Sequence, residues 1–292
     1  MSIHKISAGK YSAEVREYGG ALVSMEYDGR TIVERDLVGG KPAFFGGDIL
    51  APWPNRLRDG EYIFNGKRYQ APINEEKWST ALHGLVFDLQ WKVVDKSENF
   101  ISLTTTLDAS EAYPTSLEFL VSYELTTDCL IWTVQAENVG ENPAPYGVSV
   151  HPYLIADSSV SINDCTLSLT AGEYMTIDDR HLPIELDSVR GVFDFNGGAV
   201  IGDRYIDAAF NTEPSPRIEL TAPSGLGVWM EGDENCHWVQ IHTADRDGHV
   251  SGRKSLAVEP MTCAADAFNT EDDLLIIEPD EFHVIEFRIG AL

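Results

Sequence analysis

Period-two alternation of apolar and polar residues is the feature of this 292-residue sequence that most limits its possible folds. Such alternation places one face of a β-strand against a core and the other towards solvent. Segments that show it are rich in Val, Ile, Thr and aromatic residues, and they are residues 11–18, 100–107, 117–126, 130–138, 160–170, 217–222, 228–232, 237–243 and 283–289. No stretch of a dozen residues has a clean helical period, and the best helix candidates, residues 110–113 and 266–268, are a turn or two long. The sequence therefore predicts an all-β protein.

Turn signals between these segments favour a large antiparallel β-sandwich. Asn65 and Gly66 lie between two alternating runs in residues 61–70, which is typical of a hairpin turn whose two residues have positive φ. The chain has 24 Gly and 14 Pro but no linker-like or low-complexity tract, and its six tryptophans lack the regular spacing of propeller blades. We expect a single domain over residues 1–292, with the Gly- and Asp-rich stretch 187–207 forming surface loops.

The charge balance argues against several classes of partner. The sequence has 21 Lys and Arg against 47 Asp and Glu, which gives a formal net charge of −26. A charge of this size repels phosphate backbones and anionic membrane surfaces, and no strongly basic patch offsets it. We therefore expect the protein to bind neither nucleic acid nor membranes.

Cysteine usage and the absence of leader-like segments indicate a cytoplasmic protein. The four cysteines are scattered without a CxxC pair, as in proteins of a reducing compartment. The sequence has neither a secretory h-region at its start nor a run of 18 apolar residues. His237 and His242 are five residues apart, which puts them on opposite faces of a strand, and no Gly-rich nucleotide motif is present. We expect no metal and no cofactor.

Two segments in the N-terminal third place polar side chains beside Gly, Pro and aromatic residues. Residues 46–62 contain a tryptophan between two prolines, followed by Asn55 and Arg56. A rigid loop of this kind can present the donors of a guanidinium beside an aromatic ring, which suits a sugar. His83 lies before a glycine in residues 79–91. Taken alone, Arg56 and His83 are more typical of structural residues than of residues that bind a substrate.

Two later segments are more specific. In residues 143–155, His151 follows a short strand and precedes a proline and Tyr153, so its side chain can face a cleft where the strand ends. Glu259 lies at the end of an apolar strand, immediately before Pro260. A carboxylate there is costly unless it is hydrogen-bonded or functional, which favours a functional role. Asp207 and Gln240 are weaker candidates of the same kind.

Taken together, these segments resemble the aldose 1-epimerase family of the galactose mutarotase-like superfamily. The resemblance runs almost end to end, and its most specific pieces, in the family's order, are PWPNRLRDGEYIFNGKRYQAPINE, ALHGLVFDLQW, YGVSVHPY, IDAAF, VQIHT and VEPMTCAADAFN. It implies a galactose mutarotase-like β-sandwich that interconverts the α and β anomers of an aldohexose, such as galactose or glucose, without a cofactor. Ala264 and Ala265 stand where the family commonly has two prolines, which predicts a less rigid loop and bears on sugar preference.

The resemblance also implies a role for each motif residue. His151 would be the general acid at the sugar ring oxygen, and Glu259 the general base at the anomeric hydroxyl. The sugar-binding residues it implies, which would hold the ring oxygen and the hydroxyls, are Arg56, His83, Asp207 and Gln240, together with the motif neighbours Asn55 and Tyr153. Ring opening needs one proton delivered and one removed, and an imidazole that titrates near neutral pH beside a carboxylate suits both steps.

Other functions remain open at the level of sequence. The substrate could carry a charge, as a hexose 6-phosphate or sulfoquinovose does, with Lys77, Arg180 or Arg204 supplying a cation. A glycoside-cleaving enzyme could use Asp207 and Glu259 as its two carboxylates. A non-catalytic sugar-binding protein could keep the same cleft. The partner expected in each case is a small-molecule sugar, and the protein is expected to be a monomer or a homodimer.

Overall fold

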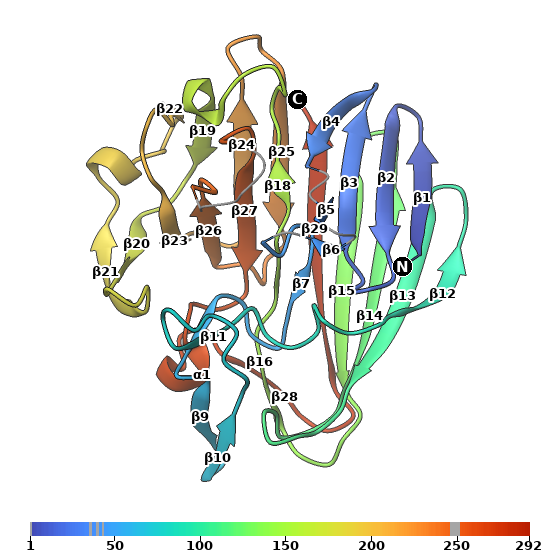
Figure 1. The fold of residues 1–292 in the computed structure, drawn as a ribbon, viewed down its shortest axis with the longest axis vertical. Coiled ribbons are helices and arrows are strands. Elements are labelled where there is room, and N and C mark those ends of the chain that lie inside the picture. The colour runs from blue at the N-terminus through green and yellow to red at the C-terminus, as the bar shows by residue number, and fades with distance from the viewer. Residues whose placement is uncertain (1, 35–36, 39–40, 43, 246–251) are drawn as a thin grey trace.

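Two large antiparallel sheets form the protein (Figure 1). The computed structural model describes residues 2–34, 37–38, 41–42, 44–245 and 252–292. The twelve-stranded sheet runs in the order β1 (Ile3–Ala8), β2 (Tyr11–Arg16), β3 (Leu22–Tyr27), β4 (Arg30–Val33), β18 (Tyr153–Leu154), β27 (Leu256–Met261), β26 (Trp238–His242), β23 (Asp207–Asn211), β20 (Glu173–Ile177) and β21 (Pro183–Ser188), with β17 (Ser149–Val150) and β7 (Ile49–Leu50) joined beside β27. The nine-stranded sheet runs β12 (Lys92–Lys96), β13 (Phe100–Leu107), β14 (Leu117–Leu125), β15 (Leu130–Asn138), β29 (Phe282–Ala291), β25 (Gly227–Gly232), β24 (Arg217–Thr221), β19 (Thr166–Leu169) and β22 (Ala199–Val200).

Short elements accompany the two sheets in the described part of the chain. Two-stranded pairs are formed by β8 (Arg56–Arg58) with β11 (Thr80–Leu82), β9 (Glu61–Phe64) with β10 (Lys67–Gln70), β16 (Ala144–Tyr146) with β28 (Leu275–Ile277) and β5 (Leu37–Val38) with β6 (Lys41–Pro42). The helical segments are α1 (Ala267–Thr270) and the 3₁₀ turns η1 (Ile162–Asp164) and η2 (Gly191–Phe193). In Figure 1, α1, β9, β10 and β11 gather at one end of the sandwich. Of the helices in the described residues, none has the length and apolarity to span a membrane.

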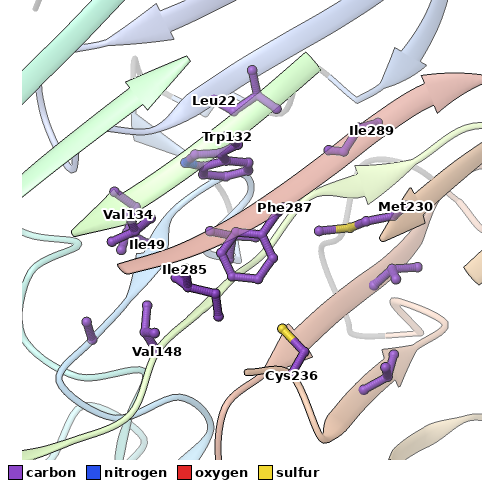
Figure 2. Packing of buried hydrophobic residues seen from close by; sticks show 14 of the residues in the cluster. Leu22, Ile49, Trp132, Val134, Val148, Met230, Cys236, Ile285, Phe287 and Ile289 are labelled. Atoms are coloured by element: carbon purple, nitrogen blue, oxygen red, sulfur yellow. The ribbon is translucent and has the colours of Figure 1, made fainter. Parts of the chain in front are cut away.

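Alternation in the sequence explains how the sheets pack. In β14 and β15 every second residue is buried, so each strand turns one face to the core. Figure 2 shows this core, with Trp132 of β15 and Phe287 of β29 beside Leu22 of β3 and Ile49 of β7. All four are at most 1% exposed, and burying a large apolar side chain contributes about 1.5–3 kcal/mol. The expected all-β antiparallel sandwich is therefore confirmed.

Most expected elements match the structure, and the exceptions have local causes. The hairpin turn is present, with φ values of 48° at Asn65 and 74° at Gly66. The strand expected over residues 160–170 is shorter, because the Ser161 side chain accepts a hydrogen bond from the backbone N–H of Asn163 and caps η1, so β19 begins at Thr166. Residues 110–113 are not helical, whereas a short helix does follow Asp266. The stretch 187–207 contains the end of β21, η2 and β22 in addition to loops.

Candidate active site

His151 and Glu259 meet on the twelve-stranded sheet. Nε2 of His151 lies 3.2 Å from Oε1 of Glu259, and their side chains are 7% and 3% exposed. His151 directly follows β17, as expected, whereas Glu259 lies inside β27 and does not end it. The strand continues through Pro260 because Met261 pairs with both Ser149 and Trp238. This pairing brings together two side chains that are 108 residues apart in the sequence.

The backbone of His151 is held by the segment before β7. Its N–H donates to the carbonyl of Asp48 at 3.1 Å, and its carbonyl accepts the N–H of Gly47 at 2.8 Å. Asp48 is itself fixed by a buried ion pair with Arg16, whose side chain is fully buried. Phe45 belongs to the same segment, and the centroid of its ring lies 4.7 Å from the centroid of the His83 ring.

Register places the other polar groups on the same sheet face. Gln240 on β26 pairs opposite Glu259, while Asp207 on β23 pairs opposite His242. Residues two apart on a strand share a face, so Gln240 and His242 point to the same side. Nε2 of Gln240 donates to Oδ1 of Asp207 at 2.7 Å, and Nδ2 of Asn55 donates to Oε1 of Gln240 at 3.2 Å. The amide of Gln240 is thereby fixed between an amide donor and a carboxylate acceptor.

Arg56 is a buried cation held by Glu75. Nε of Arg56 donates to one carboxylate oxygen of Glu75 at 2.7 Å and Nη2 to the other at 3.1 Å. Burial lowers the pKa of the Arg56 guanidinium, but the hydrogen bond with Glu75 and the charges of Asp207 and Glu75 outweigh burial and leave that pKa raised. Arg56, 4% exposed, therefore stays charged and faces the pocket with a fixed orientation.

Asn55 determines the tautomer of His83. The backbone N–H of Asn55 donates to Nδ1 of His83 at 3.2 Å, and the N–H of His83 donates to the carbonyl of Asn55 at 2.9 Å. Since Nδ1 accepts this hydrogen bond, the neutral ring carries its own proton on Nε2. His83 is therefore a hydrogen-bond donor through Nε2.

That tautomer makes the cluster of His83, His151 and Glu259 poorly suited to a metal ion. Ligand atoms of His83, His151 and Glu259 all lie within 4.8 Å of one another, a donor set that zinc can use. A ligating histidine normally donates its second ring N–H to an acceptor, which leaves the other nitrogen bare for the metal. For His83 to coordinate through Nε2, it would have to give up the hydrogen bond from Asn55.

All eight residues predicted from the sequence line one pocket. The lining residues are Phe44, Phe45, Asn55, Arg56, Leu82, His83, His151, Tyr153, Asp207, Gln240, His242 and Glu259. Sequence reasoning missed Phe45, His242 and the supporting residues Glu75 and His181. The alternation in the VQIHT segment could have indicated His242, since it shares a strand face with Gln240. Glu75 ends the first motif, but its bond to Arg56 depends on tertiary structure.

Comparison with known proteins finds several relatives that are described as aldose epimerases or galactose mutarotases. A family model described as aldose 1-epimerase matches residues 2–290. The uncharacterized protein YihR of Escherichia coli (strain K12) is 32% identical over 288 residues, which cover 97% of this chain and 91% of that protein. Human galactose mutarotase is 29% identical over 180 residues, covering 59% of this chain and 51% of that protein. The solved structure of the GalM/aldose epimerase homologue from Caenorhabditis elegans superposes with a TM-score of 0.86 at 17% identity, covering 100% of this chain and 98% of that one. A galactose mutarotase-like protein from Clostridium acetobutylicum gives 0.85 at 19% identity, with 99% and 94% covered.

Proposed function

The chain belongs to the aldose 1-epimerase family, and from this premise we propose that it interconverts the α and β anomers of a neutral aldohexose, such as galactose or glucose, by general acid–base catalysis. The observation that carries the proposal is the contact of 3.2 Å between Nε2 of His151 and Oε1 of Glu259, at the side of a pocket lined by sugar-compatible donors and acceptors. Membership of this family supports the activity of a sugar isomerase. The roles of the residues and the identity of the substrate are what we propose.

The chemistry of anomer exchange fits this pair. Opening the hemiacetal requires a proton on the ring oxygen and removal of the proton from the anomeric hydroxyl, and both oxygens are bonded to C1. His151 protonates the ring oxygen while Glu259 accepts the hydroxyl proton. After rotation about C1–C2, the ring closes on the other face of the aldehyde, and each group reverses its role. An acid or base placed in this way contributes roughly 10²–10⁴ in rate.

The remaining groups suit recognition of the sugar. Nε2–H of His83 and the guanidinium of Arg56 are donors, and the carboxylate of Asp207 is an acceptor. Aromatic rings of Phe45 and Tyr153 lie beside them, where the C–H face of a pyranose can pack. Asn55 acts indirectly, by holding Gln240 and His83.

The charges around the pocket favour a neutral sugar. Of the described residues that line it, Arg56 alone is a lysine or arginine, and Glu75 neutralises its charge. The three cations considered from the sequence are engaged elsewhere in the described part of the chain. Arg180 bonds Asp59 and the carbonyls of Trp78 and Ser79, Lys77 stacks on Trp78, and Arg204 bonds the carbonyls of Val192 and Val200. An anionic substituent would meet Asp207 and Glu259 at close range, which is unfavourable.

The pairing of the carboxylates argues against glycoside cleavage. A hydrolase of the common kind places two carboxylates across the scissile bond, one of them as the acid. Here the partner of Glu259 is His151, and Asp207 is held by Gln240 and His181. An imidazole with a carboxylate fits ring opening better than it fits cleavage.

Anomeric exchange measured by proton NMR tests the proposal. The panel is galactose, glucose, arabinose, a hexose 6-phosphate and sulfoquinovose, with wild type beside Glu259→Gln. We expect fast exchange on a neutral aldohexose, reduced by about 10²-fold or more in the variant. Glu118→Gln, on the exposed outer face of β14, is the matched control and should behave as wild type.

Each contrary outcome has a defined meaning. A folded Glu259→Gln protein with wild-type exchange overturns the assignment of the base. Faster exchange on sulfoquinovose or the phosphate overturns the neutral substrate. Binding without exchange identifies a sugar-binding protein, and release of reducing ends from oligosaccharides identifies a glycoside-cleaving enzyme.

A further inference from the structure

We propose that His181 is a positioning residue for Asp207, and that it determines how tightly the site binds the sugar more than how fast the bound sugar reacts. The inference rests on the proposed function, because it assigns Asp207 to sugar binding. His181 lies outside the pocket lining and outside every motif considered in the sequence. Nδ1 of His181 lies 3.2 Å from Oδ2 of Asp207.

Both oxygens of the Asp207 carboxylate are held by donors. Nε2 of Gln240 reaches Oδ1 at 2.7 Å, and His181 reaches Oδ2, with the hydroxyl of Tyr205 at 3.4 Å from the same atom. The Asp207 side chain is 5% exposed, so these protein donors take over much of the role of solvent. A carboxylate held at both ends presents its remaining lone pairs in fixed directions, which a sugar hydroxyl needs for a well-aligned hydrogen bond.

The turn between β20 and β21 delivers His181 to this position. The N–H of His181 donates to the carbonyl of Asp178 at 2.9 Å, and Oδ1 of Asp178 accepts the N–H groups of Arg180 and Leu182. His181 has a φ of 59°, in the left-handed region that non-glycine residues rarely occupy. A tight turn closed in this way points the imidazole back towards β23.

Contacts with Asp59 and with the loop before β11 then fix the turn. Nε of Arg180 donates to the carbonyl of Trp78 at 2.9 Å, and Nη2 reaches Oδ1 of Asp59 at 2.6 Å. The indole of Trp78 packs on the imidazole of His181, with ring centroids 4.6 Å apart. Nζ of Lys77 lies 4.1 Å from the centroid of the Trp78 ring. His181 is thus held by its turn and by the indole, while its Nδ1 is directed at Asp207.

Two substitutions separate the hydrogen bond from the ring packing. His181→Phe keeps a ring against Trp78 but has no donor, whereas the amide nitrogen of His181→Asn takes the place of Nδ1 without the ring. Asparagine also tolerates the left-handed backbone at this position. We expect His181→Phe to raise KM about tenfold with kcat within about twofold, and His181→Asn to stay within about threefold of wild type in both.

Calorimetric titration with the sugar of the panel that the wild type binds most tightly gives a readout that does not depend on turnover. The dissociation constant should rise about tenfold in His181→Phe and stay near the wild-type value in His181→Asn. Titration with singly deoxygenated analogues extends the test. On the analogue that lacks the hydroxyl bound by Asp207, wild type and His181→Phe should bind equally. His4→Phe, which removes a contact of 2.9 Å with Glu17 at the edge strand β1, is the control and should leave affinity unchanged.

The outcomes distinguish this inference from the proposed function. Wild-type KM and affinity in His181→Phe, or an equal loss in both variants, overturns the inference while exchange by the wild type upholds the function. Absence of exchange in the wild type overturns the function, and the calorimetric comparison still decides the role of His181. If His181→Phe does not fold, Arg180→Gln provides the second route, since it releases the turn at the surface and should raise KM and the dissociation constant in the same direction.

Discussion

Replacing Gly84 with alanine should strongly lower the activity of the site, although no polar residue in it is replaced. Gly84 follows His83 and has a φ of 75°. A Cβ on it would lie 2.0 Å from the carbonyl oxygen of Ala51 and 2.9 Å from the nitrogen of Pro52. The same carbonyl accepts the N–H of Leu85 at 2.7 Å, so the two backbones are held together where the clash arises.

The size of the clash gives the expected effect. Real Cβ contacts are essentially never shorter than 3.0 Å, so the two backbones must separate by about 1 Å. That displacement is carried to His83 and to Asn55, which are joined by two hydrogen bonds. A misplacement of about 1 Å in an active site can cost roughly 10²-fold in rate, which is the loss of kcat/KM we expect. The positive φ adds about 1–2 kcal/mol of lost stability.

Anomeric exchange of the folded variant, checked by circular dichroism, measures this effect. Gly29→Ala is the matched control, because Gly29 has a φ of 77° in the β3–β4 turn and its added Cβ would meet nothing within 4 Å. The control should lose a similar 1–2 kcal/mol of backbone stability, on the order expected for a left-handed alanine, and keep wild-type exchange. If folded Gly84→Ala is as active as Gly29→Ala, the link from backbone packing to the position of His83 is wrong.

Two further substitutions test the buried charges. Burial raises the pKa of Asp48 to about 7, although the charge of Arg16 and the hydrogen bond to Arg16 oppose the rise. Because burial holds the folded-state pKa of Asp48 above its unfolded value, the contribution of this group to stability is fully present below about pH 4 and is lost as pH rises through 7. The stability of wild type relative to Asp48→Asn in urea should therefore fall by a few kcal/mol from pH 4 to 8, and a constant difference would contradict the raised pKa. Glu75→Gln breaks the paired contact with Arg56 and should cost about 3–5 kcal/mol of stability in denaturant titrations and raise KM more than it lowers kcat; an unchanged KM would mean that Glu75 does not orient Arg56.

Local pattern was sufficient to predict the class of fold. The bounds predicted from alternation, residues 100–107 and 130–138, are those of β13 and β15. Alternation can be read locally because it depends only on the residue types of neighbours along the chain. The Asn65-Gly66 turn is equally local, since two residues with positive φ determine it. The prediction was wrong over residues 160–170, where the Ser161 cap competes with strand formation through a side-chain hydrogen bond.

Which side chains would meet was predicted only through motifs. The sequence assigns His151 and Glu259 to one acid–base pair because their segments resemble a family. The structure places Nε2 of His151 3.2 Å from Oε1 of Glu259. The reason for that proximity is the pairing of Ser149 with Met261, a long-range register that no local pattern contains. The link between Asp207 and Gln240 has the same origin in the register of β23 and β26.

The sequence by itself determined the all-β class, many of the strands and the list of polar residues worth testing. Only the tertiary structure decided the tautomer of His83, which depends on the backbone N–H of Asn55, and the support of Asp207 by His181. Turn 178–182 reaches Asp207 because Arg180 and Trp78 dock it across about a hundred residues of intervening chain. Such contacts depend on how the sheets twist and pack against one another, and propensity and periodicity describe only residues that are neighbours along the chain.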